Sequence, residues 1–122
     1  MINIKPLKAY TDNYIWLLET NEEVSVVDPG DAKPVLDYLE ENNKALKDIF
    51  ITHHHFDHTA GVPELMNKVS GSIYGPKNSY ELIKEEVTQE DTVSSLGIKF
   101  EVIEVPGHTL DHIAFYSKQN NI

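Results

Sequence analysis

The side chains best suited to chemistry in this sequence are histidines, and they stand in two clusters. The stretch ITHHHFDHTAGV, residues 51–62, holds four of the six histidines and one aspartate. The other two, His108 and His112, lie in PGHTLDH. Imidazole and carboxylate groups are the usual protein ligands of zinc, iron and manganese. An expression tag would be terminal, and surface histidines gathered by chance would not recur after a second strand, so the pattern favours a metal site.

The spacing within the first cluster predicts which side chains converge. Successive side chains of an extended backbone alternate, so His53 and His55 point to one side and His54 to the other. A turn after them returns Asp57 and His58 to the same region, and His108 is placed to add a third imidazole. Three imidazoles leave a coordination position for water, which is typical of catalytic metal sites. Asp57 and His58 would begin a second site.

Three further residues are expected near the ligands without binding metal. His54 is predicted to pack or to hydrogen-bond to the ligand residues, and His112 to orient a ligand by hydrogen bonding. Asp28, in VVDPGD, has the pattern of a turn residue, with hydrogen bonding to a ligand as its alternative role.

Strands mixed with helices must position these residues, which predicts an α/β fold. Runs of β-branched and aromatic residues indicate strands, two of them joined as a hairpin through TNEE. The predicted strands are INIKPLK, YIWLLE, VSVV, DIFIT at 48–52, SIYG, IKFEVIEVP at 98–106 and HIAFYSK at 112–118. A helix capped by Asp31 is predicted over AKPVLDYLEENN and a short one over ELMNKVSG, whereas PKNSYELIKEEV fits either a helix or a loop.

Composition narrows the class of protein. A length of 122 residues fits one domain, and a formal charge of −10 disfavours nucleic acid and anionic membrane surfaces as partners. The chain has no cysteine, which excludes disulfides and thiolate catalysis, and no stretch is long and apolar enough to span a membrane. We therefore expect a cytoplasmic protein.

Two motifs resemble those of a known superfamily. THHHFDH is similar to the T-H-x-H-x-D-H signature of the metallo-β-lactamase superfamily, and PGHT at 106–109 is similar to its next motif. YTDNYIWLL, VVDPGDAKPVLDYL and PGHTLDHIAFYS further resemble the bacterial glyoxalase II proteins, the hydroxyacylglutathione hydrolases. The resemblance covers nearly the whole chain. It implies an αββα sandwich, of which residues 1–122 would be the N-terminal αβ half.

The resemblance also implies roles for individual residues. His53, His55 and His108 would hold one metal ion, and Asp57 and His58 a second, with Asp57 also the candidate catalytic residue. The cofactors would be two divalent ions, zinc first, with iron or manganese as alternatives. In the family, a hydroxide bridging the metals attacks the thioester of S-lactoylglutathione and releases lactate and glutathione. The substrate would therefore be a glutathione thioester.

The family's second metal also uses an aspartate and a histidine that follow the region matched here. We therefore expect the chain to be part of a longer protein, to have little hydrolase activity alone, and to require its missing C-terminal half or self-association. Two alternatives stay open. One is a persulfide dioxygenase-like enzyme with a single iron held by His53, His108 and a later aspartate, and the other is a non-catalytic metal-binding half-domain.

Overall fold

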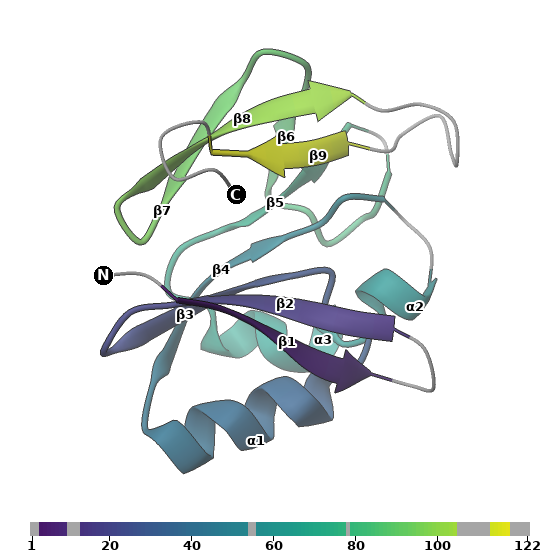
Figure 1. Ribbon diagram of the computed structural model, residues 1–122. Helices are drawn as coiled ribbons and strands as arrows, with labels where there is room; N and C mark the ends of the chain where they lie inside the picture. Colours follow the sequence, from purple (N-terminus) through teal and green to yellow (C-terminus); the bar gives the residue numbers. More distant parts are fainter. Residues whose placement is uncertain (1–2, 10–12, 54–55, 78, 105–112, 118–122) are drawn as a thin grey trace.

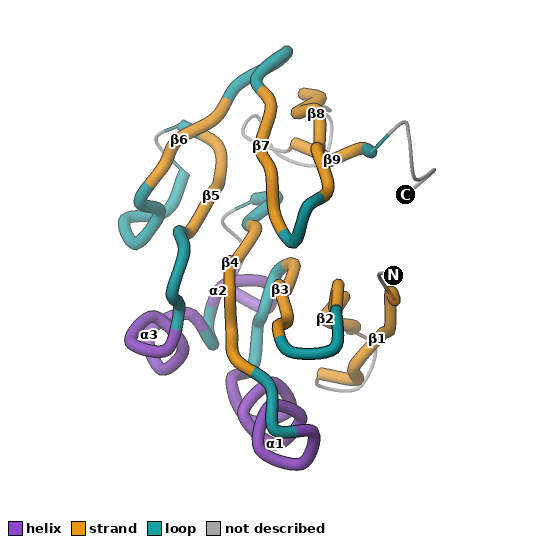
Figure 2. The backbone as a smooth tube through the Cα atoms, turned by 90° about the vertical axis from the view of Figure 1, so that its left-hand side faces the viewer, coloured by secondary structure: helices purple, strands orange, loops and turns teal. Residues whose placement is uncertain are grey.

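Two sheets and a layer of helices make up the protein. The computed structural model describes residues 3–9, 13–53, 56–77, 79–104 and 113–117. The larger sheet has the order β1-β2-β3-β4-β5-β6 and the smaller the order β7-β8-β9. Figure 1 shows β1 to β4 between the helices and the small sheet, and Figure 2 shows the same layers from the side. This helix–sheet–sheet order corresponds to the first three layers of an αββα sandwich, with a second sheet of three strands.

The bounds of the elements follow in chain order. The strands and helices are β1 (Asn3–Ala9), β2 (Asn13–Glu19), β3 (Glu23–Val27), α1 (Ala32–Asn42), β4 (Ala45–Phe50), α2 (Phe56–Thr59), α3 (Val62–Leu65), the 3-10 helix η1 (Met66–Lys68), β5 (Ile73–Pro76), β6 (Glu85–Val87), β7 (Thr92–Ser95), β8 (Ile98–Glu104) and β9 (Ile113–Tyr116). Among the described residues, no helix has the length and apolarity needed to cross a membrane.

Neighbouring strand residues point to opposite faces of the larger sheet, so they contribute to two different cores. Leu17 and Ile49 belong to the core under the helices, whereas Leu18 and Phe50 belong to the core between the two sheets. Phe50 lies at the centre of the second core, with its ring centroid 5.5 Å from that of Tyr74, 5.7 Å from Phe100 and 4.9 Å from Phe115. The two cores hold the three layers together.

Helix α1 forms where the sequence predicts it. The Asp31 side chain accepts a hydrogen bond from the backbone N–H of Lys33 at 3.1 Å, which satisfies one of the amides left open at a helix start. Pro34 lies in the first turn, where no intrahelical N–H is needed. The helix ends at Asn42, and Asn43 caps it in the left-handed conformation with φ 52°. Its buried face includes Val35 and Leu39.

Several expected elements differ from those observed. β4 begins at Ala45 and ends at Phe50, so Thr52 follows the strand instead of closing it. The helix expected over ELMNKVSG begins earlier, as α3, and continues as η1. PKNSYELIKEEV forms turns and then β6, and β7 was not predicted. The short β6 and β7 depend on pairing with β5 and β8, which local residue types do not reveal.

A buried polar network joins the two sheets. The Asp48 carboxylate on β4 accepts hydrogen bonds from the Ser95 hydroxyl on β7 at 2.6 Å and from the Ser72 N–H at 2.8 Å. The Ser25 and Ser95 hydroxyl oxygens lie 2.6 Å apart. Gly71 makes room for this carboxylate, because a Cβ there would lie 2.1 Å from Asp48 Oδ1. These bonds satisfy polar groups that would be costly to bury without partners.

A second buried carboxylate ties α1 to the edge of the larger sheet. Glu19 lies 2.8 Å from Lys44 Nζ and 2.9 Å from Lys5 Nζ, and it accepts a hydrogen bond from the Tyr38 hydroxyl at 2.5 Å. Burial acts to raise the pKa of Glu19, but the hydrogen bonds from Lys44, Tyr38 and Lys5 outweigh it and lower the pKa to about 2.

This lowered pKa predicts an acid-sensitive contribution to stability. The ordinary pKa of 4.5 applies to the unfolded chain, so the stabilisation is complete above that pH and is lost as the pH falls toward about 2. The variant Glu19→Gln should be less stable than the wild type by about 1–3 kcal/mol at pH 6. That difference should shrink between pH 5 and pH 2 in urea unfolding experiments.

The exposed Glu41 on α1 offers a matched control. Glu41→Gln also removes one negative charge, but it does not remove a buried acceptor. It should leave both the stability and its pH dependence close to wild type. A Glu19→Gln deficit that stays constant from pH 6 to pH 2 would contradict this account of the Glu19 pKa.

Candidate metal centre

The candidate site forms where two parallel strands end side by side. β3 and β4 pair in parallel, so their carboxyl ends meet at one edge of the sheet. Asp28 follows β3 directly, and Thr52 and His53 come just after β4. The backbone N–H of Asp28 donates to the carbonyl of Phe50 at 2.8 Å. Sheet topology therefore brings together residues that lie 24 positions apart in the sequence.

Asp28 is the central acceptor of the site. Its Oδ1 accepts from the backbone N–H of Thr52 at 2.8 Å, and its Oδ2 accepts from the Thr52 hydroxyl at 2.5 Å. The same Oδ2 lies 3.1 Å from Nδ1 of His58. Asp28 has a φ of 51°, a left-handed conformation that aspartate tolerates better than most residues. The carboxylate is buried, with 8% of the residue exposed.

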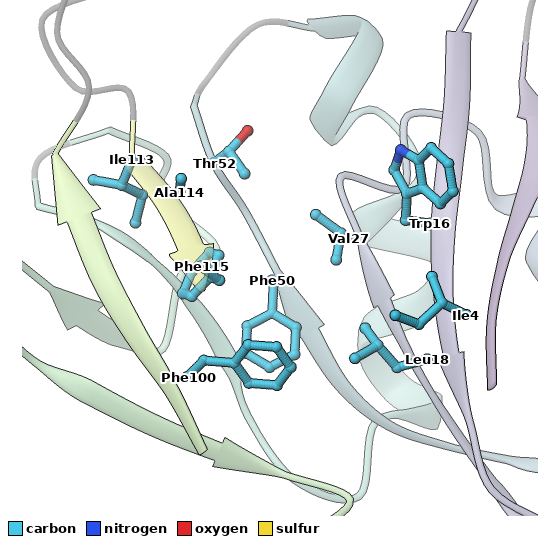
Figure 3. A pocket seen from close by; sticks show the side chains of 10 residues that line it. All are labelled: Ile4, Trp16, Leu18, Val27, Phe50, Thr52, Phe100, Ile113, Ala114 and Phe115. Atoms are coloured by element: carbon cyan, nitrogen blue, oxygen red, sulfur yellow. The ribbon is translucent and has the colours of Figure 1, made fainter. Parts of the chain in front are cut away.

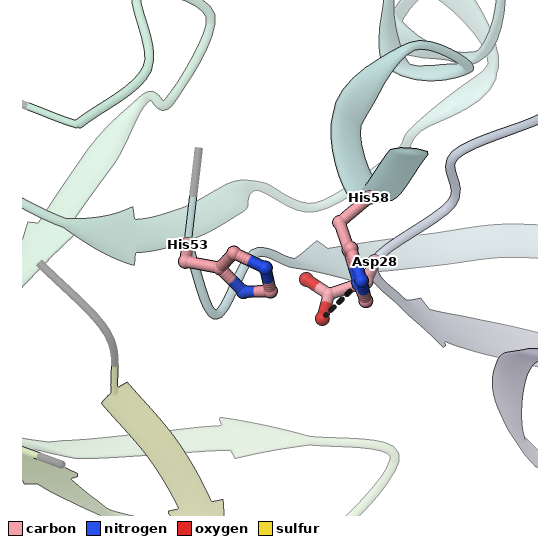
Figure 4. A group of neighbouring side chains, drawn as sticks. All are labelled: Asp28, His53 and His58. Carbon is pink, nitrogen blue, oxygen red and sulfur yellow. Dashed lines mark hydrogen bonds and ion pairs between the residues drawn. The ribbon is translucent and has the colours of Figure 1, made fainter. Parts of the chain in front are cut away.

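His53 and His58 face the Asp28 carboxylate from different elements, as Figure 4 shows. Each of the three residues offers one ligand atom, and these atoms all lie within 4.8 Å of one another. The two imidazole centroids are 4.3 Å apart. Nδ1 of His53 lies 2.9 Å from the Thr52 hydroxyl oxygen. His53 is buried, whereas the side chain of His58 on α2 is about a quarter exposed, at 26%.

Gly61 allows α2 to lie against the loop that carries Asp28. A Cβ at this position would lie 2.5 Å from the Pro29 carbonyl oxygen and 2.6 Å from the Ala32 nitrogen. Both atoms belong to the backbone and have little freedom to move aside. The N–H of Gly61 also donates to the Pro29 carbonyl at 2.9 Å. This close approach holds the segment containing His58 beside Asp28.

The small sheet reaches the same edge. The N–H of Ile113, the first residue of β9, donates to the carbonyl of Thr52 at 2.9 Å. β9 therefore begins beside the end of β4, although residues 105–112 lie outside the described residues. The contact brings the strand that follows the second histidine cluster next to the first cluster.

An apolar groove of about 360 Å³ extends from Thr52 between the two sheets. Figure 3 shows Phe50, Phe100 and Phe115 on one side of it and Trp16, Ile4 and Leu18 on the other. Trp16 and Ile4 remain 47% and 38% exposed, whereas Leu18, Phe50 and Phe100 in the same lining are buried. The groove therefore offers apolar surface of the kind that other polypeptide covers.

The residues predicted from the sequence divide into two groups. His53 and His58 are brought together. Asp28 joins them as a hydrogen-bond acceptor, which was one of the two roles considered for it. Asp57 lies on α2, but its side chain falls outside those that the structure describes, as do residues His54, His55, His108 and His112. No role was predicted for Thr52, although it opens the THHHFDH motif and its hydroxyl adjoins a candidate ligand.

The donors in this arrangement suit a metal ion of intermediate hardness. Nitrogen donors from two imidazoles beside a carboxylate are compatible with zinc, iron or manganese, and donor type alone does not choose among them. His58 hydrogen-bonded to a carboxylate through Nδ1 is the usual arrangement of a metal-binding histidine. The described residues include two of the five expected ligands, His53 and His58, and they stand beside Asp28 in a group that could hold a metal ion.

Comparison with known proteins gives a consistent relationship over the chain. The family model described as the metallo-beta-lactamase superfamily matches residues 11–122. A hydroxyacylglutathione hydrolase of Chromohalobacter salexigens is 49% identical over 120 residues, covering 96% of this chain and 47% of the relative. One of Pseudoalteromonas translucida is 46% identical and covers 98% of this chain and 48% of its own length. The chain thus spans about half the length of these curated relatives.

Solved structures share the fold at lower identity. BLEG-1 B3 metallo-beta-lactamase superposes with a TM-score of 0.84 at 19% identity, covering 97% of this chain and 68% of that one. ETHE1 from Myxococcus xanthus superposes with a TM-score of 0.78 at 24% identity, covering 96% of this chain and 53% of that one. At such identities the likeness concerns the fold alone, and it confirms the predicted α/β sandwich half.

The close approach at Gly61 leads to a prediction. Gly61→Ala should lower the free energy of unfolding by about 1–3 kcal/mol, because the added methyl group meets backbone atoms. It should also shift the NMR signals of the His58 ring by moving α2 away from Asp28. Gly97→Ala provides the contrast: its φ of 80° strains an added side chain, but no atom lies within 4 Å of the new Cβ. Gly97→Ala should cost stability and leave the His58 signals unchanged, so equal shifts in both variants would contradict the proposed role of Gly61.

Proposed function

Because the chain belongs to the metallo-beta-lactamase superfamily, we propose that the whole protein is a metal-dependent hydrolase of S-2-hydroxyacylglutathione thioesters. With S-lactoylglutathione the products would be lactate and glutathione. The observation that carries this proposal is the identity of 49% and 46% to proteins named hydroxyacylglutathione hydrolase. In this proposal residues 1–122 are the N-terminal half of the catalytic domain of a cytoplasmic enzyme.

The metal ligands in this proposal are those expected from the sequence. His53, His55 and His108 hold one ion, Asp57 and His58 hold the second, and Asp57 is also the candidate catalytic residue. Two zinc ions are proposed, with iron or manganese as alternatives. Bound metal supplies water that ionises near neutral pH and a Lewis acid for a carbonyl oxygen.

The chain's own residues contribute orientation and exclusion of water. Asp28 holds the His58 ring by a hydrogen bond at 3.1 Å, and Thr52 holds the His53 ring at 2.9 Å. Since His53 is only 4% exposed, its ring is largely shielded from solvent. Rings fixed in this way lose little further conformational freedom when they bind an ion. A thioester suits such a site because a thiolate leaves with little help from a general acid.

The main proposal has more support than the persulfide dioxygenase alternative. The relatives above 40% identity over nearly the whole chain are named as hydrolases. Loss of the thioester of S-lactoylglutathione would support the hydrolase, whereas oxygen consumption with glutathione persulfide would support the dioxygenase.

The proposed ligands predict a selective loss of metal. The purified protein should contain bound zinc, iron or manganese, measured per chain by elemental analysis. His53→Gln should lower that content and weaken binding by at least tenfold, because it removes an imidazole ligand. Glu64→Gln is the control, since this exposed carboxylate on α3 is not a proposed ligand, and it should keep the wild-type content. Equal losses in the two variants would contradict the proposed ligand set.

We also propose that the apolar groove is a contact surface. In the whole protein it would be covered by polypeptide beyond residue 122, and in the isolated chain by a second copy. Support comes from the exposed Trp16 and Ile4 in its lining and from the share of the relatives' length that the chain spans. Covering apolar side chains of this size contributes about 25 cal/mol for each Å² removed from water.

The contact proposal predicts concentration-dependent association of the 122-residue chain in sedimentation experiments. Trp16→Lys should weaken that association at least tenfold, because it places a charge at the mouth of the groove. Tyr116→Lys is the control, since Tyr116 is also exposed, at 37%, but does not line the groove. A chain that stays monomeric at all concentrations, or that responds equally to both substitutions, would contradict this proposal.

A further inference from the structure

We propose that Thr52 is a positioning residue that selects the tautomer of His53. Its hydroxyl group, held by Asp28, keeps the proton of the neutral imidazole on Nδ1 and so leaves the lone pair on Nε2. The use of that lone pair for a metal ion rests on the function proposed above, whereas the tautomer itself follows from the hydrogen bonds of the described residues.

The argument begins with the single proton of a threonine hydroxyl. Thr52 Oγ1 lies 2.5 Å from Asp28 Oδ2, and an ionised carboxylate can only accept a hydrogen bond. The hydroxyl proton is therefore committed to Asp28. Toward Nδ1 of His53, 2.9 Å away, the same oxygen can then only accept. The ring must supply the proton, which places it on Nδ1.

Asp28 imposes the same choice on His58 directly. Oδ2 of Asp28 lies 3.1 Å from Nδ1 of His58, so that ring also donates from Nδ1 and keeps its lone pair on Nε2. One carboxylate thus sets both imidazoles, one by direct contact and the other through Thr52. Among the described residues, Asp28 accepts hydrogen bonds from the Thr52 N–H, the Thr52 hydroxyl and His58. Asp28 therefore acts as an orienting group for both rings.

The fold holds Thr52 in this role through its backbone as well as its hydroxyl. The N–H of Thr52 donates to Asp28 at 2.8 Å, and its carbonyl accepts from Ile113 at 2.9 Å. These two bonds anchor the residue to β3 on one side and to β9 on the other. They do not involve the side chain, so a substitution can remove the hydroxyl group while the backbone contacts remain.

Two substitutions separate the hydroxyl from the shape of the side chain. Thr52→Val keeps the size and branching of threonine but has no group that can accept from Nδ1 of His53. Thr52→Ser keeps the hydroxyl and loses only a methyl group. The tautomer can be read from the ¹⁵N chemical shifts of the imidazole nitrogens in the metal-free protein at pH 8.5, with His53 assigned through His53→Gln.

In the wild type and in Thr52→Ser, His53 should show a protonated Nδ1 and an unprotonated Nε2. In Thr52→Val the two nitrogen shifts should move toward each other, because both tautomers become populated. His58 should keep its protonated Nδ1 in all three proteins. Zinc affinity, measured by competition with a chelator, should fall about 10–100-fold in Thr52→Val and recover in Thr52→Ser.

A protonated Nε2 on His53 in the wild type would overturn the proposal, and that measurement needs no variant to fold. Unchanged His53 shifts in a folded Thr52→Val protein would also overturn it. If the predicted tautomers are found but no form binds zinc, iron or manganese, the function proposed above is wrong and the assignment of Thr52 stands.

Discussion

The candidate metal centre depends on one buried carboxylate at the end of a parallel strand pair. Asp28 terminates β3 and accepts hydrogen bonds from the backbone and hydroxyl of Thr52 and from the ring of His58. Removing this acceptor would take one hydrogen bond from each of these donors in a largely buried place, which is costly in a medium that solvates charge poorly. Strand pairing, ring orientation and the donor atoms offered to a metal are therefore linked through a single side chain.

The surrounding fold makes this arrangement rigid by burying both faces of the larger sheet. Ile49 packs under the helices, and the neighbouring Phe50 packs among the aromatic rings between the sheets. The segment that follows them cannot shift without disturbing both cores. Gly61 and the Asp48 network extend the same constraint, because each relies on an approach too close for an added side chain. The apolar groove is the part of the inter-sheet core that described residues leave open.

Local sequence signals predicted some elements well and others poorly. The cap at Asp31, the apolar face of α1 and the alternation along β8 can be recognised in the sequence, because residues close together in the chain form each pattern. β7, with the sequence TVSS, does not, because its strand geometry comes from pairing with β8. The end of β4 was misplaced by two residues, and so Thr52 was taken as part of the strand.

The sequence by itself determined the chemistry of the candidate centre: imidazoles and carboxylates in two clusters, without cysteine, in a pattern that indicates a superfamily. It also determined that His53 and His58 lie close together, because only a short turn separates them. Only the tertiary structure decided the role of Asp28 and Thr52. They are 24 residues apart, and no local pattern reports a contact that exists because β3 and β4 run parallel and end together. Which nitrogen of each ring carries the proton is settled by that contact, since hydrogen-bond direction depends on partners brought together by folding.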